Sequence, residues 1–147
     1  MNNKVLCVAM STVIALAATS CGQKAPDIAG KYESEIAVSG GRSDIGISDF
    51  DSSLPVYLVV GKDNTFSIDL GFKELKKDLN KKADDIERGG VYVVKDITVT
   101  GTDHYEGTVE YKDGQFVFTG DLSFVATYED GTLSADNLFG EKNLEFK

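Results

Sequence analysis

The feature that most constrains the fold of this chain is the alternation of apolar and polar residues in short segments. In residues 28–39, Tyr32, Ile36 and Val38 share one face of an extended strand, and Glu33 lies on the other face. A period of two residues is the pattern of a half-buried β-strand. Similar segments follow, separated by turn residues every 8–12 positions or so, which is typical of an antiparallel barrel or sandwich. The chain is therefore predicted to be all-β.

The pattern predicts eight or nine strands, which fits a barrel of about eight. Residues 40–53 are rich in Gly, Asp and Ser and predict a long loop, and residues 61–64 predict a hairpin turn. With this many strands in one domain, a closed barrel is favoured over a sandwich, because closure removes exposed strand edges. The predicted strands are 28–39, 54–60, 65–70, 91–100, 105–111, 115–121, 123–128, 132–136 and 143–147.

The period changes once, in the middle of the chain. Apolar residues there recur at spacings of three and four, which predicts one amphipathic helix over about 72–88. Asp78 and Lys82 are four positions apart, a spacing that gives a helix modest support, and a Gly-Gly pair at 89–90 ends it. The apolar stripe is narrow, so we expect the helix to lie on the barrel or to cap one of its ends. The stripe consists of Phe72, Leu75, Leu79, Ala83 and Ile86.

The first 27 residues follow a different pattern. A short polar start contains Lys4, and residues 5–18 are apolar apart from two hydroxyl side chains. This stretch is shorter than the ~20 apolar residues that a membrane-spanning helix needs. Small residues at 18–20 then precede Cys21. A basic start, a short apolar core and a small-residue cleavage site predict an export signal, which leaves residues 28–147 as a single barrel domain.

This arrangement resembles the signal peptide of bacterial lipoproteins, in which the cysteine is acylated and becomes the first mature residue. The resemblance implies a signal peptide over 1–20, a lipidated Cys21 and a tether over 21–27. The alternative is an ordinary secretory signal in which the cysteine is incidental. Two or three acyl chains would hold the protein on the membrane permanently, because each buried CH₂ contributes ~0.8 kcal/mol.

The same resemblance implies a location in the cell envelope, on the outer membrane. Surface-exported lipoproteins of this group tend to carry acidic residues directly after the cysteine. Residues 22–26 contain none, and the first acidic residue is Asp27. The periplasmic face is therefore favoured over the cell surface.

Short motifs in the barrel region are similar to those of the calycin-like, lipocalin-like lipoproteins of Bacteroidetes. They are Gly-Lys-Tyr at 30–32, Gly-Lys-Asp-Asn-Thr-Phe at 61–66 and Asp-Ile-Thr-Val-Thr-Gly at 96–101. The resemblance spans most of residues 28–147. It implies a small up-and-down barrel, an exported protein and, in many members, no known activity.

Charge and reactive residues narrow the functional classes. The chain has a net charge of −9, which becomes more negative by one when Lys4 is removed with the signal. Nucleic acid is therefore not an expected partner, because its binding requires a basic surface. His104 is the only histidine, and no nucleophile motif accompanies it. No cysteine–histidine cluster suggests zinc, and the acidic residues match no EF-hand loop. We expect no enzyme, no cofactor and no metal.

The aromatic residues suggest two functions of different kinds. An eight-stranded barrel is just wide enough to be filled by its own side chains or to hold one small ligand. The first hypothesis is a non-catalytic module that binds a small apolar molecule in the barrel, capped by helix 72–88. The alternative is a filled barrel that serves as a protein-interaction or structural component of an envelope complex. The predicted lining residues are Tyr32, Phe66, Phe116, Phe118, Phe124 and Tyr128.

Overall fold

The computed structural model describes residues 24–42, 47–87 and 99–147, which contain eight strands and one helix. The predicted signal peptide, Cys21 and most of the strand predicted over 91–100 lie outside the described residues. The elements are β1 (Gly30–Arg42), β2 (Ile47–Val60), β3 (Thr65–Leu70), α1 (Phe72–Glu87), β4 (His104–Lys112), β5 (Gln115–Gly120), β6 (Phe124–Glu129), β7 (Thr132–Leu138) and β8 (Glu141–Phe146).

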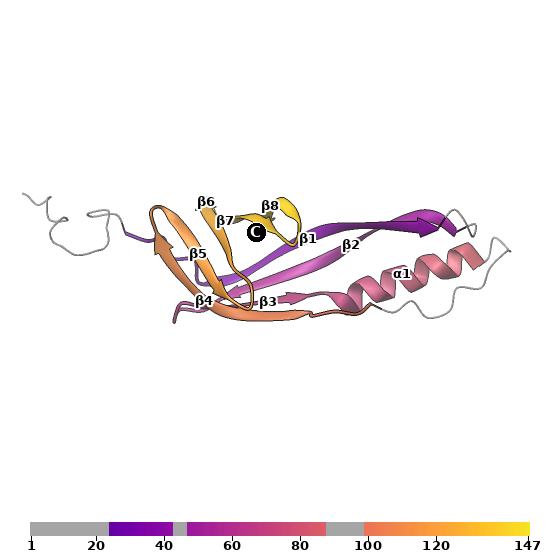
Figure 1. Cartoon of the computed structure of the whole chain (residues 1–147), viewed down its shortest axis with the longest axis horizontal. Helices are drawn as coiled ribbons and strands as arrows, with labels where there is room; N and C mark the ends of the chain where they lie inside the picture. Colours follow the sequence, from indigo (N-terminus) through magenta and orange to yellow (C-terminus); the bar gives the residue numbers. More distant parts are fainter. Residues whose placement is uncertain (1–23, 43–46, 88–98) are drawn as a thin grey trace, which may run out of the picture.

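The strands form one antiparallel sheet in which each strand pairs with the next along the chain. The two ends of this sheet meet at Glu33 of β1 and Lys147, directly after β8. The backbone N–H of each residue donates to the carbonyl of the other, at 2.9 and 3.0 Å. The sheet is therefore a nearly closed barrel (Figure 1), and the predicted all-β, antiparallel, calycin-like barrel with one helix is confirmed.

The inward faces of the strands fill the barrel. In β3, for example, Phe66 and Ile68 are buried and Asp69 is exposed, as the two-residue period requires. All eight strands contribute buried side chains to one hydrophobic cluster. The side chains with the least exposure are large, and they include Phe118 and Phe146. Every strand of the barrel thus takes part in the core.

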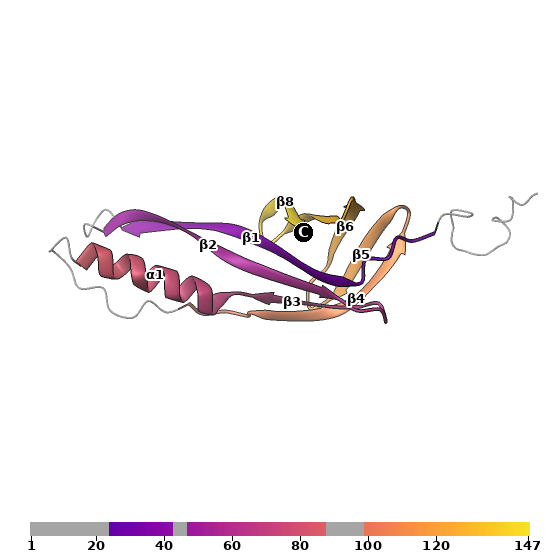
Figure 2. The same cartoon turned by 180° about the vertical axis from the view of Figure 1, so that it is seen from behind.

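One part of the molecule extends well beyond the barrel. β1 and β2 have 13 and 14 residues, but β3 pairs with β2 only over 56–60. The remaining hairpin, residues 34–42 and 47–55, projects from one end of the barrel together with α1 (Figures 1 and 2). We call these three segments the arm. The described residues 24–29 lie at the opposite end of the barrel (Figure 1).

The helix α1 forms where it was predicted, but it lies along the arm and not over the barrel end. It starts directly after Gly71, whose carbonyl accepts a 3.0 Å hydrogen bond from the N–H of Leu75. Leu75 and Leu79 are 6% and 7% exposed, and the helix packs against β2. Because β3 stops at Leu70, the helix takes the next position beside β2 and covers an edge that would otherwise face water.

The long loop predicted over 40–53 is wrong. β1 continues to Arg42 and β2 begins at Ile47, and the ladder places Val38 opposite Ser52 and Ala37 opposite Ser53. The composition of this stretch favours turns locally. Cross-strand hydrogen bonds and the packing of α1 override that preference, because β propensity depends strongly on the surroundings.

Two glycines allow β4 and β5 to approach closely beneath an aromatic ring. Gly107 and Gly120 are opposite each other in the ladder. A Cβ atom at position 107 would lie 2.3 Å from the carbonyl oxygen of Thr119 and 2.8 Å from Cε1 of Phe66. One contact is with backbone, which cannot move aside without shifting the strand. The absence of a side chain here therefore makes room for Phe66 in the core.

We predict that Gly107→Ala lowers the free energy of unfolding by about 1–3 kcal/mol, the usual effect of adding atoms to a packed core. Urea unfolding, followed by tyrosine fluorescence, measures the change. Gly30→Ala is the matched control, because a Cβ there has its nearest neighbour at 3.8 Å, an ordinary contact. Equal stability of the two variants would contradict this account of the β4–β5 contact.

Candidate functional site

Three of the predicted lining residues pack on one another inside the barrel. The rings of Phe118 on β5 and Phe124 on β6 are stacked, with centroids 4.4 Å apart and an interplanar angle of 8°. Phe66 on β3 meets both rings edge-on, at 5.1 and 5.9 Å. All three side chains are 6% exposed or less. At this level, the barrel interior is therefore filled by its own side chains, and a ligand could enter only by separating the rings.

Of the other three predicted lining residues, Tyr32 and Phe116 belong to the same hydrophobic cluster and Tyr128 packs against it. Tyr32 is buried, and its hydroxyl donates a 2.8 Å hydrogen bond to the carbonyl of Ile28. Burial raises the pKa of Tyr32, and the nearby Tyr128 and Asp27 raise it further. Tyr128 is half-buried against the core. The Tyr32 bond fixes the segment that precedes β1 onto the barrel.

Phe116 lies at the barrel end that receives residues 24–29. Its ring centroid is 4.8 Å from that of Tyr111. Both rings line a pocket of about 200 Å³, which also has walls from the N-terminal segment, the β2–β3 turn and β4. The lining includes apolar side chains such as Val60 and Val109 and charged ones such as Lys62. Phe116 is thus a predicted lining residue that faces a pocket at the end of the barrel.

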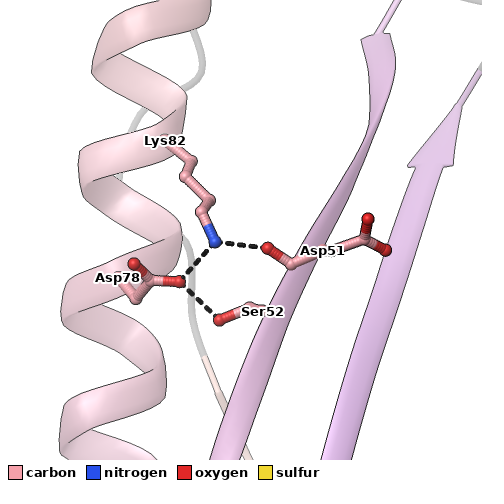
Figure 3. Close-up of polar contacts among 4 residues, drawn as sticks. All are labelled: Asp51, Ser52, Asp78 and Lys82. Carbon is pink, nitrogen blue, oxygen red and sulfur yellow. Dashed lines mark hydrogen bonds and ion pairs between the residues drawn. The ribbon is translucent and has the colours of Figure 1, made fainter.

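The arm carries a polar cluster that joins α1 to β2 (Figure 3). Asp78 of α1 accepts a 2.5 Å hydrogen bond from Ser52 Oγ and a 2.7 Å bond from Lys82 Nζ. Lys82 Nζ also donates to the backbone carbonyl of Asp51. Two helix side chains therefore hold one backbone group and one side chain of β2.

Hydrogen bonds set the charge state of this cluster. The bond from Lys82 lowers the pKa of Asp78, and the bond from Ser52 lowers it further. Asp78 therefore remains ionised through the neutral range. Its side chain and that of Lys82 are 42% and 38% exposed, so solvent screens their attraction. The cluster positions the helix on the strand more than it stabilises the fold.

A second polar group lies where β3 and β4 pair. His104 Nδ1 is 2.6 Å from Asp69 Oδ1, and Nε2 is 3.6 Å from Glu106 Oε2. Both carboxylates raise the pKa of His104, with the Asp69 hydrogen bond as the largest cause. Each ring nitrogen faces a carboxylate, and a Ser-His-Asp arrangement would need one of them to face a hydroxyl nucleophile.

Sequence reasoning missed the arm as a feature. The four-residue spacing of Asp78 and Lys82 was visible, but Asp51 and Ser52 fell in a predicted loop, so nothing placed them beside the helix. The regular alternation of Leu54, Val56 and Leu58 was a usable signal. The strand that it predicts could have been extended toward the N-terminus, into the residues that were predicted as a loop. Cys21, the predicted lipidation site, lies outside the described residues.

No protein-family model, curated protein or solved structure matches this chain. Within residues 24–42, 47–87 and 99–147, no group of three or more His, Cys, Asp or Glu side chains could hold a metal ion. In the same residues, no helix is long and apolar enough to cross a membrane.

We predict that His104 titrates above its ordinary pKa of 6.5 and that Asp69→Asn lowers this pKa toward 6.5, because the largest cause of the shift is removed. A raised folded-state pKa stabilises the protein below pH 6.5, and that contribution is lost as pH rises through the folded-state value. NMR of the imidazole protons measures it directly, since the chain has one histidine.

Glu110→Gln is the control for this titration. It removes an exposed carboxylate from the same strand, and no described contact joins it to His104. An unchanged His104 pKa in Asp69→Asn, or an equal fall in Glu110→Gln, would show that the Asp69 contact does not set the charge of the histidine.

Proposed function

We propose that this chain is a non-catalytic lipoprotein of the cell envelope, held by lipid on Cys21, whose barrel is a scaffold that presents the arm to a protein partner. The observation that carries the proposal is the packing of Phe66, Phe118 and Phe124 against one another. A filled interior makes the barrel a rigid support, which favours the protein-interaction hypothesis over the carrier hypothesis.

The position of the N-terminal segment supports a role for the arm. Residues 24–29 meet the barrel at the end opposite the arm (Figure 2). The tether of residues 22–27 spans at most ~20 Å when extended. A lipid on Cys21 would therefore hold the barrel close to the membrane and leave the arm pointing away from the attachment point. The helix α1, with 16 residues, gives the arm a length of roughly 24 Å.

The end pocket supports a second candidate function, the binding of a small molecule. Its volume of about 200 Å³ is below the roughly 300–1,000 Å³ of typical ligand sites. An occupant would be correspondingly small, would contact Tyr111 and Phe116, and would lie close to the tether. The lining of the pocket is only partly apolar, which a carrier of lipid-sized molecules would not be expected to have. The scaffold function is therefore favoured over the carrier function.

Site-specific photo-cross-linking in the cells that make the protein tests the proposal. We predict that a photo-reactive residue at Ala37, exposed in the arm, yields a cross-linked protein in the membrane fraction. The matched control is Thr108, which is exposed on the outer face of the barrel in β4. We expect little or no cross-linking there, because the barrel wall is the support and not the contact surface.

Cys21→Ser tests the anchor in the same experiment. Without the acylated cysteine, the chain should leave the membrane fraction, since no other lipid attachment is proposed. Retention of the Cys21→Ser chain in membranes would contradict the anchor. Cross-linking from Thr108 with none from Ala37 would contradict the role of the arm.

A further inference from the structure

One face of the helix α1 is made of lysines. Five of the 15 Lys and Arg residues fall within residues 73–82, although the chain as a whole has a net charge of −9. Lys82 is used inside the arm, where it bonds to Asp78 and to the carbonyl of Asp51. The other four lysines are exposed, and we call them the lysine face. They are Lys73, Lys76, Lys77 and Lys81.

The packing of α1 fixes the direction of this face. The helix lies along β2 in the arm (Figure 2), with Leu75 and Leu79 buried. Glu74, Asp78 and Lys82 line an open groove between α1 and β2, and no member of the lysine face lines it. The acidic residues in the middle of the helix therefore lie on its β2 side, and the lysine face points away from it.

The stability of the helix does not account for this arrangement. Lys73, Lys77 and Lys81 follow one another at a spacing of four, and like charges at this spacing destabilise a helix. Among the described residues, no member of the lysine face has a hydrogen bond or ion pair. The last turn contains acidic residues within 84–87 and no basic one, the opposite of what the helix dipole favours.

Solubility does not account for the lysine face either. A net charge far from zero keeps a protein soluble, and this chain already has a net charge of −9. Each lysine brings that charge closer to zero. A group of lysines on one helix face instead creates a local positive field on a negative protein, and such a field attracts molecules of the opposite charge. The face therefore fits an acidic partner.

The dimensions of the face limit the shape of that partner. The face is one helix wide, about 10 Å, and Lys73 and Lys81 are roughly 12 Å apart along the helix axis. Acidic residues border it, with Glu74 and Asp78 on the β2 side and further acids within 84–87 at the end of the helix. A broad anionic surface such as a membrane would meet these acids as well. A narrow acidic segment can contact the lysines alone.

We propose that the lysine face binds an acidic segment of the protein partner of the arm. Lys73, Lys77 and Lys81 are ~6 Å apart along the helix. Side chains on one side of an extended segment are roughly 6.6 Å apart, so Asp or Glu at every second position can place one carboxylate against each lysine. Bonds between ammonium and carboxylate groups are stronger than neutral hydrogen bonds. The inference rests on the proposed function and names the chemistry of its partner.

Carbodiimide cross-linking in membranes of the cells that make the protein tests the contact directly. The reagent activates a carboxylate, and the amine of a touching lysine then forms an amide without a spacer. Peptide mass spectrometry should find the lysine face joined to Asp or Glu of another protein. Asp78 and Lys82, 2.7 Å apart, provide an internal link that shows that the reagent has reached the arm. Equally frequent links from the barrel lysines Lys112 and Lys142 would overturn the inference.

Charge reversal tests the same contact without carbodiimide. In the chain with a photo-reactive residue at Ala37, the helix variant should give several-fold less cross-linked protein. Glutamate is a good helix former and no described contact is lost, so the variant should fold, as judged by circular dichroism. The helix variant carries Lys73→Glu, Lys77→Glu and Lys81→Glu.

A barrel variant is the matched control for this charge reversal. It reverses three exposed lysines outside the arm, so the net charge changes by the same amount, and it should keep the wild-type yield of cross-linked protein. A corresponding fall in the barrel variant would show that overall charge, and not the lysine face, attracts the partner. The barrel variant carries Lys31→Glu, Lys112→Glu and Lys142→Glu.

The outcomes separate this inference from the proposed function. Equal capture of a protein by the wild-type and helix-variant chains would overturn the inference and leave the proposed function standing. If Ala37 captured no protein in the wild-type chain, the proposed function would fail and the inference with it. The purified Cys21→Ser chain should not sediment with phosphatidylglycerol vesicles. Sedimentation that the helix variant loses would assign the lysine face to a lipid surface and overturn the inference.

Discussion

The packing of Phe66, Phe118 and Phe124 inside the barrel is the contact on which the rest of the structure depends. The stacked pair and the edge-on ring bring β3, β5 and β6 around one centre. The position of Phe66 in turn requires the bare backbone at Gly107, where a Cβ would lie 2.8 Å from the ring. Buried aromatic rings contribute large apolar areas and prefer such offset or edge-on geometry. Filling the barrel in this way leaves the outer surface and the two ends as the places where other molecules can bind.

The second constraint is that the exposed edges of the sheet must be paired with another strand or covered. In the barrel, the sheet closes through the paired backbone groups of Glu33 and Lys147. In the arm, the helix takes the place of a strand along β2, with Lys82 and Gly71 bonded to carbonyls of that edge. The edge of β1 has no equivalent cover among the described residues. The two edges of the arm are therefore covered to different extents.

Much of the barrel could be predicted from the sequence, because a two-residue period that switches to a helical one is a local signal. Alternation identified β3 to β8 to within a few residues, and the spacing of Leu75 and Leu79 identified α1. The arm could not be predicted in this way. Gly, Asp and Ser in residues 40–53 favour turns locally, and the ladder that makes them strands depends on contacts between β1, β2 and α1. The position of α1 was not predictable either, because it depends on where β3 ends. Since β3 ends at Leu70, the helix takes the next position beside β2.

The candidate site shows the same division between local and non-local information. Sequence alternation was enough to place Phe66, Phe116, Phe118 and Phe124 inside the barrel, but it could not decide whether they fill the interior or line a cavity. That outcome depends on ring-to-ring geometry across strands that are far apart in the chain. The partnership of Ser52 with Asp78, 26 positions apart, likewise has no local signature.

The central claim is that the barrel is filled by its own side chains and works through its outer surface. Native mass spectrometry of the protein, released from envelope membranes in mild detergent, tests this most directly when it is compared with the denatured mass of the same sample. The account predicts that the native mass equals the denatured mass or a whole multiple of it. A reproducible additional mass that disappears on denaturation would identify a bound small molecule and contradict the claim.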